Sequence, residues 1–191
     1  MRNLILVGGV HGAGKDFLIN SIKDKIPFIH LSASKVLKWN EISPCSATKL
    51  VDSLVDTQER LVKNLRKAVK NNDSLYLLDG HFTLLNKNSE VMRVPADTFV
   101  QIAPMVLVVK TSLPKVISWR LQKRDRQIWE IDKVAEMQRA EIAYAHELAK
   151  KLKLPFYLIA DGQENMLAEI ILKHNVQNTL PPMFDRDLKG R

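Results

Sequence analysis

A glycine-rich turn follows the first apolar run of this 191-residue chain. Residues 4–7 read Leu-Ile-Leu-Val, and residues 9–16 read Gly-Val-His-Gly-Ala-Gly-Lys-Asp ahead of a helical pattern. Glycines let the backbone bend so that several N–H groups point at one anion, and the next helix presents its positive dipole end to that anion. Lys15 adds a mobile charge for the β- and γ-phosphates. The pattern predicts a nucleotide-binding loop for ATP, formed by Gly9, Val10, His11, Gly12, Ala13, Gly14, Lys15, Asp16 and Phe17.

Asp16 stands where such loops normally carry Ser or Thr, whose hydroxyl binds Mg²⁺. A carboxylate is a good ligand for this hard cation, so Asp16 is a predicted metal ligand. The same charge lies near phosphate and weakens nucleotide binding when metal is absent. The other interpretation, an ordinary acidic residue favoured by the dipole of the first helical turn, stays open.

Composition and charge limit the class of protein. Hydrophobic residues make up 46% and charged residues 26%, which is typical of one globular domain. No apolar run approaches the roughly 18 residues that cross a membrane, and the chain enters its first strand without a secretory pattern. A single cysteine, Cys45, forms no internal disulfide. We therefore expect a cytoplasmic protein with no membrane association.

The formal net charge of +8 favours anionic partners such as nucleotides. Arg60, Lys63, Lys67 and Lys70 recur at helical spacing opposite an apolar side. This pattern indicates first a solvated helix face and second a surface for nucleic acid. The sequence says nothing about oligomeric state or protein partners.

Predicted strands and helices alternate along the chain. Strands are expected at 4–7, 28–31, 75–78, 105–109 and 156–159, and helices at 14–25, 32–39, 46–71, 95–102, 113–124, 132–152 and 163–174. Ser32 is the expected cap of its helix, and residues 82–94 form a loop with a small hairpin or turn. The alternation predicts an α/β fold, three layers around a five-stranded parallel sheet. One domain spans 1–174, and residues 175–191 are a tail, flexible or docked.

Asp79 ends the third predicted strand, in the run Leu-Leu-Asp-Gly-His of residues 77–81. An acidic residue at the carboxyl end of a strand beside a phosphate loop commonly holds Mg²⁺, so Asp79 is the second predicted metal ligand. A carboxylate that orders the backbone there is the alternative. His81 either hydrogen-bonds an acceptor nucleotide or braces a loop.

Three arginines follow the fourth predicted strand, in the run of residues 120–126. Phosphoryl transfer spreads negative charge over the transferred group, and the planar, permanently charged guanidinium suits its stabilisation. Arg120, Arg124 and Arg126 are therefore predicted to be catalytic groups on a closing lid. Lys15 is predicted to be a catalytic group of the phosphate loop. A basic helix end is the plainer interpretation.

The second predicted strand is followed by Leu-Ser-Ala-Ser at 31–34, without an acid. Kinases that phosphorylate a hydroxyl commonly use a carboxylate there to accept its proton, whereas a phosphate acceptor is already ionised. This favours a nucleoside monophosphate as acceptor, although Asp79 remains a candidate base.

These motifs together resemble the archaeal-type adenylate kinases and related nucleotide-kinase-like P-loop proteins. The matching features are the loop at 8–15, the helix segment at 56–61, Leu-Asp-Gly-His at 78–81, the basic run at 120–126, and the long helix carrying Glu136, Gln138 and Glu141. The resemblance covers residues 1–174.

The resemblance implies a helical acceptor-binding arm at 32–71 and a short lid at 120–132. It further implies MgATP-dependent phosphorylation of AMP, with AMP between Ser32, Arg60 and His81. Asp16 and the tail motivate another hypothesis, a P-loop ATPase or nucleotide sensor that acts through a protein or nucleic-acid partner.

Overall fold

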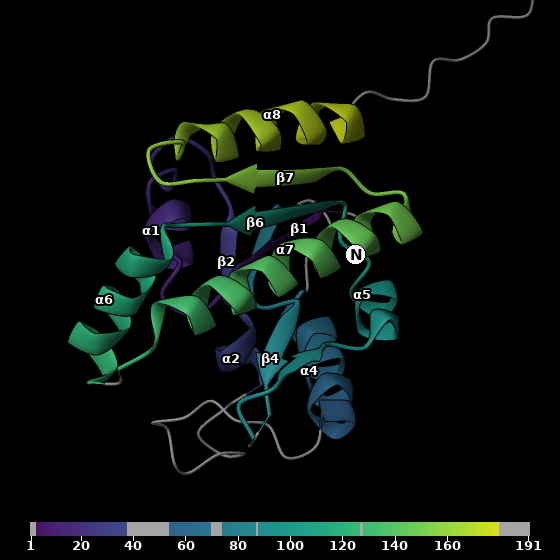
Figure 1. Ribbon diagram of the computed structural model, residues 1–191. Helices are drawn as coiled ribbons and strands as arrows, with labels where there is room; N and C mark the ends of the chain where they lie inside the picture. Colours follow the sequence, from purple (N-terminus) through teal and green to yellow (C-terminus); the bar gives the residue numbers. More distant parts are fainter. Residues whose placement is uncertain (1–2, 38–53, 70–73, 87, 127, 180–191) are drawn as a thin grey trace, which may run out of the picture.

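The computed structural model describes residues 3–37, 54–69, 74–86, 88–126 and 128–179. Its main sheet has five parallel strands in the order β2-β3-β1-β6-β7 (Figure 1). Their bounds are β1 Leu4–Gly8, β2 Ile29–Ser32, β3 Tyr76–Asp79, β6 Val106–Lys110 and β7 Phe156–Ile159. The predicted α/β fold with a five-stranded parallel sheet is confirmed.

Helices cover both faces of this sheet because its central strands are apolar on both sides. Leu4 and Leu6 of β1 belong to one core cluster, and Ile5 and Val7 to another. The first cluster includes residues of α4 Leu54–Ala68, α5 Ala96–Ile102 and α7 Ile131–Leu152. The second includes residues of α1 Lys15–Asn20 and α8 Asn165–Thr179. The result is three layers, with α7 crossing the sheet in Figure 1.

A third, smaller cluster packs the phosphate loop against the segment between β6 and α7. Val10 and Ala13 of the loop contact Ile117 and Leu121 of α6 Pro114–Asp125, together with Val134 at the start of α7. The loop is thus held from beneath by apolar contacts, while its other side faces the edge of the sheet where the strands end.

The segment after β3 forms the predicted hairpin, with β4 Thr83–Leu85 antiparallel to β5 Val91–Arg93. Helix α2 Ala33–Val36 follows β2 directly. Ser32 occupies its N-cap position, but the expected capping bond is absent. The Ser32 hydroxyl lies instead 3.0 Å from the Ser34 hydroxyl.

Helices α1 and α8 differ most from prediction, each by five residues at the C-terminal end. Helix α1 ends at Asn20, and the chain continues to Ile26 mainly in tighter i→i+3 turns before Pro27, which disfavours helix in the preceding residue. Helix α8 runs to Thr179, five residues beyond the expected end at 174, because no helix-breaking residue comes before Pro181. Residues 46–53 of the predicted long helix, Cys45, Lys70 and the tail from 180 onward lie outside the described residues.

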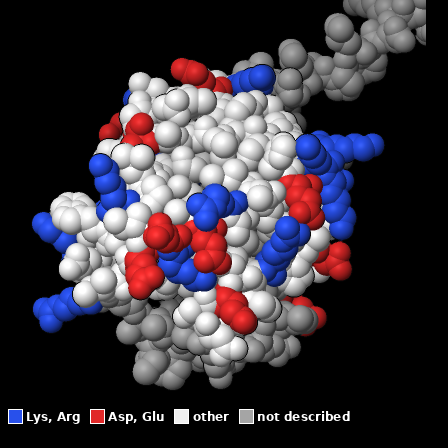
Figure 2. Space-filling model, in the orientation of Figure 1, with Lys and Arg blue, Asp and Glu red and all other residues white. Residues whose placement is uncertain are grey.

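Among the residues that the structure describes, no helix combines the length and apolar character that a membrane span needs. On the face shown in Figure 2, Lys and Arg side chains are interspersed with Asp and Glu side chains. The predicted nucleic-acid surface on α4 stays a prediction.

Candidate active site

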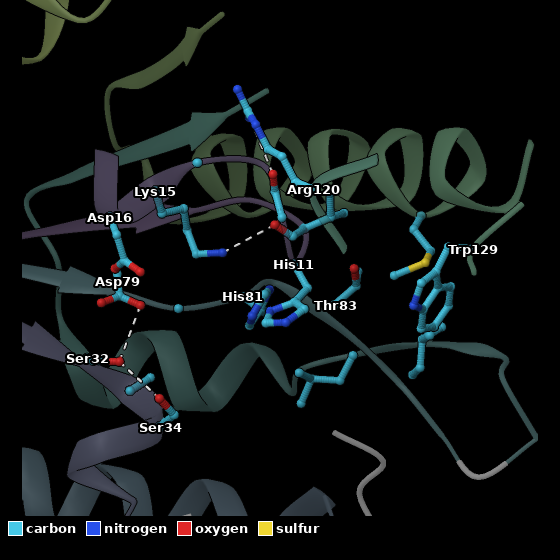
Figure 3. Close-up of a pocket in the computed structure, with 18 of the residues that line it drawn as sticks. His11, Lys15, Asp16, Ser32, Ser34, Asp79, His81, Thr83, Arg120 and Trp129 are labelled. Carbon is cyan, nitrogen blue, oxygen red and sulfur yellow. Dashed lines mark hydrogen bonds between the residues drawn. The ribbon is translucent and has the colours of Figure 1, made fainter. Parts of the chain in front are cut away.

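The carboxyl ends of β1, β2 and β3 open into a cavity of about 1920 Å³. Its lining brings together most of the predicted site residues, among them His11 and Arg124, which are 113 positions apart in the chain. They are Val10, His11, Gly12, Gly14, Lys15, Asp16, Phe17, Ser32, Asp79, His81, Arg120 and Arg124. Figure 3 shows Lys15, Asp16 and Asp79 on one side of this cavity and Thr83 and Trp129 on the other.

Three glycines give the phosphate loop its shape. Gly9, Gly12 and Gly14 have φ angles of 141°, 82° and 94°, in the region that side chains rarely adopt. A Cβ on Gly9 would also lie 2.5 Å from the carbonyl oxygen of Lys110. The loop therefore requires glycine for conformation and for close packing against β6.

Lys15 begins α1, and its ammonium folds back over the loop. Nζ donates to the carbonyl oxygens of Gly9 at 2.6 Å and Val10 at 3.3 Å. Figure 3 shows this side chain reaching across the loop. Neutral carbonyls are weaker partners than phosphate oxygens, so a polyphosphate would draw the ammonium toward itself.

Asp16, His30 and Asp79 each offer a ligand atom, and these atoms lie within 4.8 Å of one another. His30 Nε2 lies 2.7 Å from Asp79 Oδ2, and the Ser32 hydroxyl donates to Asp79 Oδ1 at 3.4 Å. Two carboxylates at this spacing fit Mg²⁺, and an imidazole also suits softer divalent ions.

His30 was not among the predicted site residues. The signal that identifies it is the period of two in strand β2, which places His30 and Ser32 on the same side. Ser32 is the register partner of Asp79, so that side of β2 faces the predicted metal ligand.

Arg120 and Arg124 reach the loop from α6. The Arg120 guanidinium donates to the carbonyl oxygens of Gly12 and Ala13, each at 3.4 Å. The Arg124 guanidinium contacts the imidazole of His11. Both arginines therefore lie beside the phosphate loop, and their place on a closing lid stays a prediction.

Four predicted residues do not line the cavity. Gly9 and Ala13 belong to the loop, but both are buried. Arg126 is exposed in a left-handed conformation at the C-cap of α6, because the helix ends there and turns the chain outward. Arg60 lies on α4, whose cavity-lining residues are Thr57, Gln58 and Leu61. The structure thus brings neither Arg126 nor Arg60 to the candidate site.

A second charged cluster lies beside the loop at the ends of β6 and β7. The fully buried Lys110 donates to Asp161 Oδ1 at 2.5 Å and to the Thr111 carbonyl at 2.9 Å. Ser112 Oγ also donates to Asp161, and Arg120 lies 3.6 Å from it. Partial burial raises the pKa of Asp161, but the bonds from Lys110 and Ser112 outweigh burial and lower it overall. The sequence analysis did not identify this cluster.

Helix α7 contributes two polar side chains beneath the site. Gln138 accepts from the backbone N–H of Ser112 at 3.1 Å and donates to its carbonyl at 3.0 Å. The fully buried Glu141 accepts from Gly9, Phe82 and Thr83. Burial raises the pKa of Glu141, against the opposing effects of these hydrogen bonds and of the Lys15 charge. Both residues entered the sequence analysis only through the resemblance.

A glycine-rich phosphate loop, two carboxylates with an imidazole, and two arginines surround one cavity, an arrangement typical of a P-loop protein. A family model described as AAA domain matches residues 8–138, from the start of the loop to α7. The chain belongs to this family. No curated protein matches the sequence.

The chain is similar to several solved structures of P-loop kinase fold. One is shikimate kinase from Acinetobacter baumannii in complex with shikimate, at 15% identity and a TM-score of 0.55, with 95% of this chain and 96% of that chain covered. A second is a gluconokinase from Sinorhizobium meliloti 1021, at 11% identity and a TM-score of 0.53, with 93% of each chain covered. A third is a sugar kinase from Janibacter sp. HTCC2649, at 13% identity and a TM-score of 0.56, with 92% of this chain and 95% of that chain covered. At these identities the similarity shows the fold, and the resemblance to archaeal-type adenylate kinases stays a prediction.

Proposed function

We propose that the protein is a small-molecule kinase that transfers the γ-phosphoryl group of ATP to a nucleoside monophosphate. One observation carries this proposal: the phosphate loop opens into the same cavity as the predicted acceptor residues Ser32 and His81. A volume of about 1920 Å³ exceeds the about 300–1,000 Å³ of a typical single-ligand site, so donor and acceptor fit side by side.

On the donor side, loop N–H groups and Lys15 bind the polyphosphate, and Asp16 and Asp79 are the residues that would hold Mg²⁺. When bound, Mg²⁺ neutralises charge on the β- and γ-phosphates. Arg120 and Arg124 lie on the opposite side of the loop, where guanidinium groups stabilise charge on the transferred group and help to exclude water.

Taken as a whole, the described cavity lining carries more cationic than acidic side chains. The cationic ones are Lys15, Lys35, Arg120, Lys123, Arg124 and Lys133, and the acidic ones are Asp16, Asp79 and Glu130. Two phosphorylated substrates match this excess. Trp129, together with leucines of α4 and of the hairpin, offers apolar surface to a base.

In the proposed reaction, an oxygen of the acceptor phosphate forms a bond to the γ-phosphorus. The bond from that phosphorus to the β–γ bridging oxygen breaks, and ADP leaves with the electron pair. The acceptor oxygen is already ionised, so no base is required for this reaction.

The contact between His30 and Asp79 supports a second candidate acceptor, a hydroxyl compound. At 2.7 Å from the carboxylate, the imidazole of His30 is oriented as a general base would be. A small polyol or hydroxy acid would lose its proton to this pair as its oxygen attacks. Both candidate reactions transfer the γ-phosphoryl group of ATP. They differ in the compound that accepts this group.

The test supplies MgATP with each of the four common ribonucleoside monophosphates and, separately, with gluconate, shikimate and simple sugars. We expect one monophosphate to be converted to its diphosphate, with one ADP formed from ATP for each diphosphate made. Chromatography and ³¹P NMR measure the products. Consumption of ATP with every monophosphate untouched overturns the proposed acceptor class. A phosphorylated hydroxy compound would then favour the second candidate, and phosphate release alone would favour an ATPase.

A further inference from the structure

The strands β1 and β3 separate at the active-site edge, and a buried carboxylate lies between them. Their last bond runs from the N–H of Gly80 to the carbonyl of Val7 at 3.1 Å. Beyond it, the Gly9 N–H donates to Glu141 Oε1 at 3.0 Å, and the Phe82 N–H donates to the same oxygen at 2.9 Å. Beyond the last backbone hydrogen bond between the two strands, the Glu141 carboxylate therefore joins their two backbones.

The other oxygen of Glu141 is equally occupied. Oε2 accepts from the N–H and the hydroxyl of Thr83, each at 2.6 Å. An ionised carboxylate is acceptor-only, with about four lone-pair sites, and all four bonds are made here. Because the side chain is 0% exposed, no water replaces a lost partner. Three of the four donors are backbone N–H groups, which cannot accept a proton in return, so this geometry favours the charged form.

The two segments that Glu141 joins carry different parts of the site. Gly9 begins the loop that leads to Lys15 and Asp16, whereas Phe82 and Thr83 follow Asp79 and His81. One turn earlier on α7, Gln138 fixes the backbone of Ser112 in the same manner, from both its N–H and its carbonyl. Helix α7 therefore sets the spacing between segments that follow β1, β3 and β6.

We propose that Glu141 is a positioning residue for phosphoryl transfer, which holds the phosphate loop and the Asp79–His81 segment at the separation that the reaction needs. This inference rests on the proposed function. It gives the carboxylate an effect on rate that exceeds its effect on substrate binding, because misplacement of reacting groups by about 1 Å costs on the order of 100-fold in rate.

Glu141→Gln is the sharpest variant. It keeps the size of the side chain, but one acceptor oxygen becomes an NH₂ group that faces two donors. The matched control is Tyr144→Phe, on the same helix, which removes the buried bond from the Tyr144 hydroxyl to the Val94 carbonyl at 2.6 Å and leaves the four bonds of Glu141 in place. Melting temperature, kcat and KM for both substrates, and amide hydrogen exchange are measured for each variant.

Glu141→Gln is expected to lower kcat about 100-fold, while each KM stays within about threefold of wild type. Amide exchange at Gly9, Phe82 and Thr83 should be faster than in the wild type. Tyr144→Phe is expected to lower the melting temperature while kcat stays within about twofold. Equal kcat for Glu141→Gln and Tyr144→Phe overturns the inference and leaves a purely structural carboxylate.

Two further measurements keep the test decisive. If Glu141→Gln does not fold, Thr83→Val removes one donor and should lower kcat about tenfold, the equivalent of one bond, while Thr83→Ser restores it. Wild-type rates in both variants overturn the inference. If the wild type phosphorylates no acceptor, the proposed function fails separately. Positioning is then tested by amide hydrogen exchange, which should be faster at Gly9, Phe82 and Thr83 in Glu141→Gln but not in Tyr144→Phe. Equal exchange in the two variants overturns the inference.

Discussion

Two lysines approach the phosphate loop from opposite sides and are held in opposite ways. Lys15 lines the cavity and donates to the backbone carbonyls of Gly9 and Val10. Lys110 is fully buried and bonds to the carboxylate of Asp161. A neutral carbonyl is readily exchanged for phosphate, whereas a buried ammonium that leaves its carboxylate stays uncompensated. The first lysine is therefore suited to follow a substrate, and the second to fix the frame around it.

The same contrast extends to the two ends of the active-site edge. Near β2 and β3, the possible ligand atoms of Asp16, His30 and Asp79 lie within 4.8 Å of one another. Around β6 and β7, Asp161 is already bonded to Lys110 and Ser112. Similar residue types thus produce a candidate metal site at one end and a closed network at the other. The difference is that Asp161 is paired with a fully buried lysine, whereas Asp79 is paired with a partly exposed histidine.

Replacing Lys15 with Ala should have the largest effect on function. The variant loses a charge-assisted contact to the β- and γ-phosphates, so the Kd for MgATP should rise about 100-fold and kcat should fall about 1,000-fold. Calorimetry and product assays measure the two quantities. The control Lys25→Ala removes a surface lysine whose bond is to Asn165. A Kd within about threefold of wild type for Lys15→Ala would contradict the role assigned to the loop.

Arg120 and Arg126 divide the predicted lid into a part at the site and a part outside it. Arg120→Ala removes a guanidinium that contacts loop carbonyls, and kcat should fall about 100-fold. Arg126→Gly removes an equal charge at a left-handed position that glycine adopts without strain, and kcat should stay within about twofold. Steady-state kinetics check both, and equal losses would show that the lid closes over Arg126 as well.

The contrast between the two ends of the edge also separates what the sequence predicts from what it does not. The phosphate loop and the positions of the strands depend on residues close together in the chain, so glycine spacing and apolar runs predict them. Lys110 and Asp161 are 51 positions apart, and Gly9 and Glu141 are 132 apart. No local pattern records such pairs, because they form only when the sheet brings distant strands together.

Glu141 nevertheless leaves a trace in the sequence. It shares a helical stripe with Ala145, Leu148 and Leu152, which is the apolar side of α7. A carboxylate at an apolar position needs several donors, which indicates a buried acceptor rather than a surface charge. The acceptor-binding arm is less accessible to such arguments, since residues 38–53 lie outside the described chain and Arg60 does not line the cavity.

Asp161→Asn should affect stability more than catalysis. It leaves the buried Lys110 without a charged partner, and the unfolding free energy should fall by about 2 kcal/mol, a value reduced from that of fully buried pairs because Asp161 is partly exposed. Urea unfolding measures the loss, with the exposed Asp24→Asn as control. An unchanged unfolding midpoint would show that the network does not hold the frame.

The pH dependence has a defined sign. Because the pKa of folded Asp161 lies below its ordinary value of 3.8, its contribution to stability is present above that value and is lost as the pH falls through the folded pKa. The stability difference between wild type and Asp161→Asn should therefore shrink in acid. A difference that stays constant down to about pH 2 would contradict the lowered pKa.

The smallest effect is expected from Asp16→Thr, which replaces one predicted metal ligand with the hydroxyl that such loops usually carry. With Mg²⁺ present, kcat should stay within about threefold of wild type or rise, because both groups are oxygen ligands. With EDTA present, ATP should bind more tightly to the variant, since a negative charge beside the phosphates has been removed. Calorimetry with and without metal measures both affinities. A fall in kcat of tenfold or more would mean that the Asp16 carboxylate is specifically required. The group of Asp16, His30 and Asp79 would then tolerate substitution as little as the Lys110–Asp161 pair is expected to.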